Sequence, residues 1–108
     1  MGRIVIACYR PKPGQQEALR HLMRSHVSTL RSIDLVTDRR PITMEAKDGT
    51  IVEVFEWASD EAIDKAHSHP VVLKMWEAYD EVCEYIPVSQ VPEATELFSK
   101  FRPVEVNL

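Results

Sequence analysis

One histidine with a nearby carboxylate is the first place to look for chemistry in this chain. His67 follows Ala66, and Asp64 lies one helical turn earlier, where a carboxylate can reach and orient the imidazole. Because histidine changes charge near neutral pH, such a pair can act as a general acid or base. We predict His67 as a catalytic residue. The alternative is an exposed histidine at a helix surface or helix end.

Glu53 is the most informative carboxylate, because it occupies an apolar strand. It shares one face of that strand with Ile51, Phe55 and Trp57. Apolar surroundings favour the neutral form of a carboxyl group unless it is paired, which suits a proton acceptor from a phenolic or enolic substrate. We therefore predict Glu53 as a second catalytic residue. The alternative is a cross-strand ion pair with Arg10, Arg39 or Arg40.

Two further histidines are predicted at a substrate pocket. His26 lies in the apolar stripe of a long helix and is either an acid or base opposite His67 or a core histidine bonded to a carbonyl group. His69 precedes Pro70 and is pushed towards an extended backbone, so it either points into a cleft or lies in a solvated turn. His67, His69 and Asp64 offer three ligands for a metal, but alternate helix positions diverge. We expect no metal.

Aromatic side chains recur on the predicted strands and helices and are candidates for the wall of a substrate pocket. The alternative is that they form ordinary core packing. The residues concerned are Trp57, Phe55, Trp76, Tyr79 and Tyr9.

The elements that must position these residues follow from apolar periodicity. Residues 3–10 are apolar and β-branched and predict a strand, which Pro11, Pro13 and Gly14 end. Helical spacing of apolar residues predicts a helix over 15–33. Alternation over 42–46, a turn at Asp48 and Gly49, and an apolar run over 51–57 predict a hairpin.

The second half of the chain predicts a divided helix, a strand and a tail. Ser59 is a good N-cap for a helix that Pro70 kinks or divides near Ser68. Residues 85–91 predict an edge strand weakened by Pro87. Residues 1–91 then form one domain. Residues 92–108 form a tail that packs on the domain or on a partner subunit, with a short helical turn around Leu97, Phe98 and Phe101.

The order strand, helix, strand, strand, helix, strand predicts an α+β ferredoxin-like split βαβ sandwich with a four-stranded sheet. We expect the sheet to be antiparallel except at its centre, where right-handed crossovers would make the first and third strands parallel neighbours. The second and fourth strands would lie at the edges. Both central strands are apolar on both faces, yet two crossover helices cover only one face. We therefore predict a homodimer that buries the other face; a folded-back tail is the alternative.

Composition narrows the function classes. The chain has 108 residues and a formal charge of −4, which argues against nucleic-acid binding because phosphate neutralisation needs a basic patch. Its apolar runs are too short for a membrane helix. Cys8 and Cys83 both lie in apolar segments, as reduced buried thiols do, which indicates a cytoplasmic protein.

Short motifs add a family resemblance. Pro13-Gly14 opens the first helix, residues 55–62 read Phe-Glu-Trp-Ala-Ser-Asp-Glu-Ala, and Ala66-His67 and Pro70 follow. With these motifs the chain resembles the dimeric α/β-barrel superfamily, and within it the antibiotic-biosynthesis-monooxygenase-like proteins, over residues 3–91. The resemblance implies a homodimer, a pocket between sheet and helices, and His67 as the family's helix histidine. It also implies, in some members, oxidation of phenolic compounds by molecular oxygen without a cofactor.

Three functions compete on this basis. The first is a cofactor-independent monooxygenase or related enzyme acting on a small aromatic or enolic compound. The second is a non-catalytic or stress-related dimeric module that holds a small apolar ligand in the same pocket. Haem cleavage ranks third, because the haem-degrading relatives use an asparagine near the histidine and the only asparagine here is Asn107.

Overall fold

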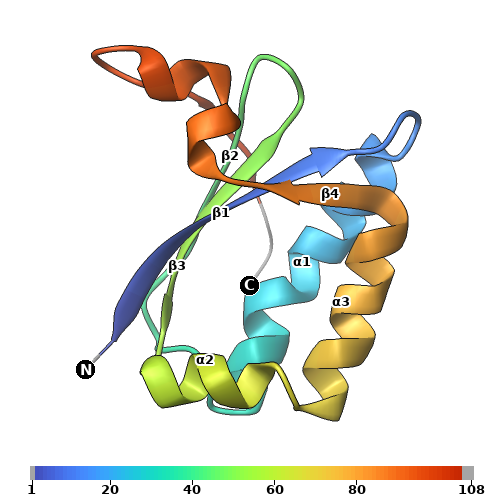
Figure 1. Ribbon diagram of the computed structural model, residues 1–108, viewed down its shortest axis with the longest axis vertical. Coiled ribbons are helices and arrows are strands. Elements are labelled where there is room, and N and C mark those ends of the chain that lie inside the picture. The colour runs from blue at the N-terminus through green and yellow to red at the C-terminus, as the bar shows by residue number, and fades with distance from the viewer. Residues whose placement is uncertain (1, 106–108) are drawn as a thin grey trace.

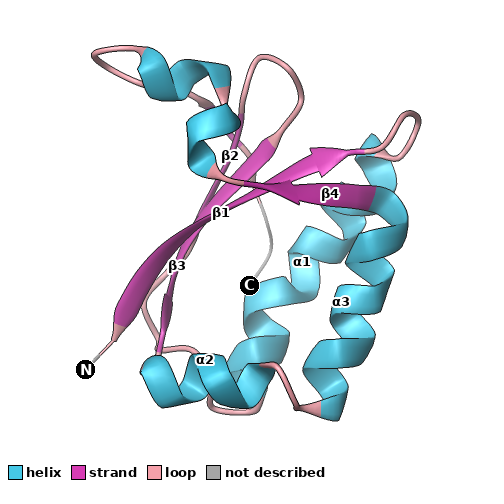
Figure 2. Ribbon diagram, in the orientation of Figure 1, coloured by secondary structure: helices cyan, strands magenta, loops and turns pink. Residues whose placement is uncertain are grey.

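The computed structural model describes residues 2–105 and shows an α+β fold with its helices on one side of a sheet (Figures 1 and 2). Two single 3-10 turns, η1 (Val88–Gln90) and η2 (Pro92–Thr95), follow the last long strand. The helices and strands are β1 (Arg3–Pro11), α1 (Gln16–Ser32), β2 (Ile42–Glu45), β3 (Ile51–Trp57), α2 (Asp60–Ala66), α3 (Pro70–Val82), β4 (Cys83–Ile86) and β5 (Arg102–Pro103).

The sheet has the strand order β4-β1-β3-β2-β5, and every neighbouring pair is antiparallel. The predicted parallel pairing of the first and third strands is therefore wrong: Arg3 lies opposite Trp57 and Tyr9 opposite Ile51. The crossover through α1 makes β1 and β2 run in the same direction. The hairpin then inserts β3 between them in the opposite direction. The arrangement is compatible with a ferredoxin-like fold.

The end of the chain differs from the prediction in two ways. The last long strand is Cys83–Ile86, shorter and earlier than residues 85–91, because Pro87 cannot donate to a ladder and the chain turns into η1. The sheet has five strands, because β5 pairs with β2 through Met44 opposite Pro103 and Glu45 opposite Arg102. Strand β2 is therefore not at the edge.

Helix α1 confirms the predicted apolar stripe. Its buried positions are Leu19, Met23, His26, Val27 and Leu30, which recur at the helical period. The stripe faces the sheet, so it brings one ionisable side chain, His26, into the interior.

The second helix is divided, as predicted, into α2 and α3. The Ser59 hydroxyl accepts a 3.0 Å hydrogen bond from the Ala62 N–H and begins α2. Pro70 opens α3, where its missing N–H costs nothing. His69 is the N-cap of α3, and its Nδ1 accepts a 3.2 Å hydrogen bond from the Val71 N–H.

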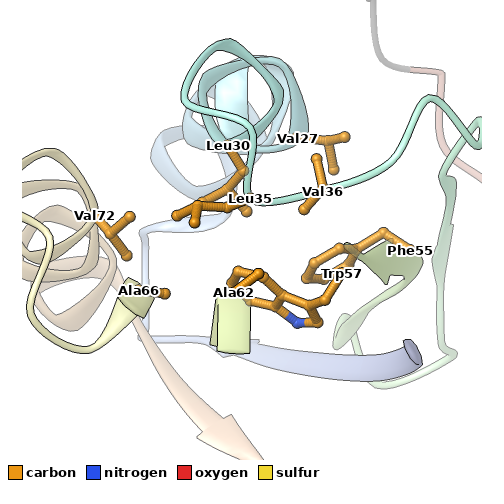
Figure 3. Packing of buried hydrophobic residues seen from close by; sticks show 9 residues of the cluster. All are labelled: Val27, Leu30, Leu35, Val36, Phe55, Trp57, Ala62, Ala66 and Val72. Carbon is orange, nitrogen blue, oxygen red and sulfur yellow. The ribbon is translucent and has the colours of Figure 1, made fainter. Parts of the chain in front are cut away.

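The core lies between the sheet and the helices. Figure 3 shows one cluster of this core, where Phe55 and Trp57 of β3 meet Val27 and Leu30 of α1. A second cluster of the core surrounds Tyr9, Met23 and Tyr79. Among the described residues, no helix is long and apolar enough to cross a membrane.

The opposite face of the sheet is apolar but only partly covered. The tail buries one end of it, where Val91 packs with Cys8, Ala46 and Val52. At the other end Ile4, Ile6 and Ile42 are exposed by 58%, 53% and 59%. The tail thus covers part of the face that the sequence predicted to be apolar.

Candidate functional site

A carboxylate, an imidazole and a phenol meet in the interior between β1, β3 and α1. Glu53 Oε1 lies 2.8 Å from His26 Nδ1 and accepts a 3.0 Å hydrogen bond from the Tyr9 hydroxyl. The side chains are nearly inaccessible to solvent, with exposed fractions of 1% for Glu53 and 3% for both His26 and Tyr9. We call these three residues the polar triad.

Strand register explains why the triad assembles. Glu53 lies opposite Ala7, whose small side chain leaves space above the centre of the sheet. Tyr9 is two residues further along β1 and therefore points to the same face. Its ring stacks on Tyr79 of α3, with centroids 5.4 Å apart. His26 enters from the buried stripe of α1, so helix, strand and hairpin all contribute to one polar contact.

The hydrogen-bond pattern assigns the roles of the ring nitrogens. A carboxylate beside Nδ1 is satisfied when that nitrogen carries the proton, which leaves the Nε2 lone pair free. The Tyr9 hydroxyl donates to the same oxygen. Burial, and then the Glu53 charge, raise the pKa of Tyr9 well above its ordinary value, so the phenol stays protonated and remains a donor.

A cavity of about 310 Å³ opens beside the triad. Its wall is mostly apolar, with Trp76 and the half-exposed Tyr85 contributed by α3 and β4. Larger hollows, of about 470 and 390 Å³, lie along β2 and the tail, and neither is lined by a triad residue. The lining residues of the triad cavity are Val5, Ala7, Tyr9, His26, Phe55, Trp57, Trp76 and Tyr85.

The structure gathers some of the predicted site residues and separates others. Phe55, Trp57, Trp76 and His26 line the cavity. Tyr79 is fully buried behind Tyr9 and belongs to the core. His69 is occupied as the cap of α3.

His67 lies outside the cavity lining. It is exposed at the C-terminal end of α2, and its Nδ1 contacts the Ile63 carbonyl oxygen at 2.8 Å. The expected orientation by the Asp64 carboxylate is therefore wrong. Its ring packs edge-on against Trp76, with centroids 5.3 Å apart. The predicted opposition of His26 and His67 across a pocket does not occur, because His67 is not among the residues that line the cavity, whereas His26 lines it and contacts Glu53.

The alternative expected for Glu53, an ion pair with arginine, is also wrong. Arg39 instead pairs with Glu56 at 3.1 Å, on the other face of β3. The Thr37 hydroxyl and then Arg39 lower the pKa of Glu56 below its usual value. Within residues 2–105, no three His, Cys, Asp or Glu side chains cluster as metal ligands.

Two contributors to the site were not recognised from sequence. Tyr9 was expected only as an aromatic wall, and its hydroxyl bond to Glu53 was missed. Tyr85 was read only as the start of a strand, but it packs against Tyr9 with ring centroids 5.6 Å apart. The signal for Tyr9 was available, since it follows Val5 and Ala7 on one face of β1.

Comparison with known proteins supports the architecture but indicates no activity. No family model matches the chain, and no curated protein matches it. Among solved structures, the chain is similar to that of Rv0793 from Mycobacterium tuberculosis, with a TM-score of 0.64 and 25% sequence identity. The similarity covers 80% of this chain and 89% of that chain.

Proposed function

We propose that the chain is an enzyme that removes a proton from a small aromatic or enolic compound, with His26 as the base. The contact that carries the proposal is the 2.8 Å approach of Glu53 Oε1 to His26 Nδ1 at the wall of an aromatic cavity. The carboxylate fixes the ring and stabilises the imidazolium that forms when Nε2 takes a proton. Glu53 then acts as a positioning residue, and His26 replaces His67 as the catalytic histidine.

The family resemblance supplies the fuller reaction. In a cofactor-independent monooxygenation, the proton goes to Nε2 and the electron pair stays on the substrate as a phenolate or enolate. That anion is oxidised by molecular oxygen: one oxygen atom enters the product as a carbonyl, and the other leaves as water, which takes the proton back from Nε2 and the remaining hydrogen of the oxidised carbon. The hydrophobic wall supports this proposal, because it holds a flat apolar compound and limits water around the anion. As part of the same proposal, the chain has a split βαβ fold of the dimeric α/β-barrel type.

Oxygen consumption with a panel of anthrone and quinol compounds tests this function. We expect turnover that His26→Ala reduces by at least about 100-fold, the usual contribution of a general base. His21→Ala, which alters an exposed histidine on the same helix, is the matched control. Loss of activity in His67→Ala but not in His26→Ala would return the catalytic role to His67. Absence of turnover across the panel would contradict the enzymatic proposal.

A non-catalytic ligand-binding module is the second candidate. The observation that favours it is the apolar character of the cavity. Apart from the indole N–H groups of its two tryptophans, the lining has polar side-chain groups at His26, Tyr9 and Tyr85 alone. A rise in melting temperature with anthrone-type compounds, without product formation, would favour this candidate.

We further propose that the protein is cytoplasmic and pairs with a second copy through the exposed part of its sheet. Cys8 and Cys83 are both free and buried, which suits a reducing compartment. The exposed row of isoleucines on the sheet supports self-association, because apolar patches of this kind mark interfaces on soluble proteins.

A further inference from the structure

All three tyrosines of the chain, Tyr9, Tyr79 and Tyr85, lie in one cluster. The ring centroids are 5.4 Å apart for Tyr9 and Tyr79, 5.6 Å for Tyr9 and Tyr85, and 6.4 Å for Tyr79 and Tyr85. Strands β1 and β4 run side by side (Figure 1), and their register places Tyr9 opposite Tyr85. Helix α3, which carries Tyr79, leads directly into β4. The three rings therefore form a continuous aromatic path.

This path joins the interior of the protein to its surface. Tyr79 and Tyr9 are 0% and 3% exposed, whereas Tyr85 is 49% exposed. Tyr9 and Tyr85 also line the triad cavity. Because an electron passes readily between aromatic rings in contact, Tyr9 can exchange an electron with a molecule that touches only Tyr85.

The two buried hydroxyl groups differ in what can receive their proton. A phenol that loses one electron becomes a strong acid and releases its proton to the nearest acceptor. The Tyr9 hydroxyl donates to the Glu53 carboxylate at 3.0 Å, in a charge-assisted hydrogen bond. The Tyr79 hydroxyl donates to Met23 Sδ at 3.5 Å, and a thioether is only a weak acceptor. A proton acceptor in place therefore makes Tyr9 the easier of the two to oxidise.

Burial favours the same transfer. It raises the pKa of both Tyr9 and Tyr79, so both phenols are neutral before oxidation. When the Tyr9 proton moves to Glu53, the radical is neutral and the buried carboxylate loses its charge. An apolar interior disfavours charged groups, so this product state is stabilised there.

We propose that Tyr9 is a redox-active tyrosine that quenches organic radicals in the cavity, with Glu53 as its proton acceptor and Tyr85 as its link to a reductant at the surface. A phenoxyl or peroxyl radical takes one electron from Tyr9 and becomes an anion, which takes a proton from water. The Tyr9 proton moves to Glu53 Oε1. This activity goes beyond the proton abstraction proposed for His26 and does not require it.

The return of Tyr9 to its phenol form completes the cycle. Tyr85 gives one electron to the Tyr9 radical, which takes its proton back from Glu53, and Tyr85 releases its own proton to water. A small thiol at the surface then gives a hydrogen atom to the Tyr85 radical. In total, one hydrogen atom passes from the thiol to the trapped radical, which leaves a phenol or hydroperoxide and a thiyl radical.

Pulse radiolysis of the full chain with azide tests the first step, because the azide radical oxidises tryptophan and tyrosine by one electron. Tyr79→Phe/Tyr85→Phe leaves Tyr9 as the single tyrosine, so a tyrosyl radical seen in this variant by absorbance and electron paramagnetic resonance is on Tyr9. We expect this signal, and we expect Glu53→Gln in the same background to lower its yield by about 10-fold or more, because an amide accepts no proton. Glu81→Gln, at an exposed position of α3, is the matched control.

The absence of a tyrosyl radical in Tyr79→Phe/Tyr85→Phe would overturn the proposal. An equal yield with and without Glu53→Gln would overturn the role of Glu53. Both tyrosine substitutions keep the aromatic ring, and neither removes a hydrogen bond to a charged group, so the variant should keep its circular dichroism and melting transition.

A thiol added to the same experiment tests the link to the surface. In Tyr79→Phe, which keeps Tyr9 and Tyr85, the radical should decay at a rate that rises with thiol concentration. In Tyr79→Phe/Tyr85→Phe this dependence should be lost. Equally fast decay in both variants would overturn the role of Tyr85 and leave the oxidation of Tyr9 intact. Turnover of anthrone compounds is measured without azide, so failure of either proposal leaves the other standing.

Discussion

Glu53 Oε1 and His26 Nδ1 lie 2.8 Å apart, joining the centre of β3 to the buried face of α1. The contact serves two purposes. It gives the buried imidazole a hydrogen-bond partner and gives the Glu53 carboxylate a second one beside the Tyr9 hydroxyl, and it determines which ring nitrogen remains free. Structural and chemical roles therefore have to be separated by experiment.

Replacing Glu53 by Gln keeps the shape of the side chain but removes its charge. Because a buried hydrogen bond to a charged group is replaced by a neutral one, we expect the free energy of unfolding to fall by about 1–3 kcal/mol. Urea titration followed by circular dichroism measures the change. Glu81→Gln, at an exposed position of α3, should leave the stability within about 0.5 kcal/mol of wild type. Equal stability of Glu53→Gln and wild type would show that the contact with His26 contributes little.

The burial of Tyr9 lets us predict how the stability of the protein changes at alkaline pH. Its folded pKa is raised by burial first and by the Glu53 charge second. A phenol whose folded pKa exceeds the unfolded value stabilises the fold below that unfolded value, about 10, and this contribution is lost as the pH rises above it. We expect stability to fall above about pH 10, and to fall less steeply in Tyr9→Phe. Absorbance at 295 nm should show Tyr9 ionising only as the protein unfolds; early ionisation of Tyr9 would contradict its burial.

The parts of this site that were predictable from sequence are those that depend on one element alone. Helical spacing placed His26 on the buried side of α1, and strand alternation placed Glu53 on the face of Phe55 and Trp57. Their contact was not predictable, because it depends on how α1 packs over β3. For His67 the structure agrees with the alternative, an exposed histidine at a helix end: α2 ends at Ala66, and the ring turns back to the Ile63 carbonyl.

The tail shows the same limit in another form. Apolar residues at 97, 98 and 101 predicted a short helical turn, and that was wrong, although Phe101 packs on the domain. The 3-10 turns fall earlier, and Leu97 and Phe98 find no apolar neighbour that buries them. A pattern of apolar residues reveals that burial is needed but does not say whether the same chain provides it.

Thr43 offers a test of polar packing next to the triad. It lies opposite Glu53 on β2 and is 5% exposed, and its hydroxyl oxygen has no hydrogen-bond partner in the described part of the chain. Replacing an unsatisfied buried hydroxyl by a methyl group removes a desolvation cost, so Thr43→Val should raise the free energy of unfolding by about 1 kcal/mol. Thr43→Ser, which keeps the hydroxyl, should not. Destabilisation by Thr43→Val would indicate instead that the hydroxyl holds Glu53 through a bridging water.

Ala7 is the residue through which the cavity itself can be tested. It is among the smallest of the lining side chains and lies opposite Glu53. Leucine at this position would occupy part of the cavity of about 310 Å³. Because the added methyl groups enter existing space, Ala7→Leu should keep the free energy of unfolding within about 1.5 kcal/mol of wild type. It should nevertheless weaken the binding of an anthrone-type compound, measured by fluorescence titration, by at least about 10-fold. Ala94→Leu, at an exposed position of η2, is the control for added hydrophobicity. Unchanged binding in Ala7→Leu would place the ligand elsewhere, because a compound that tolerates a filled cavity does not occupy it.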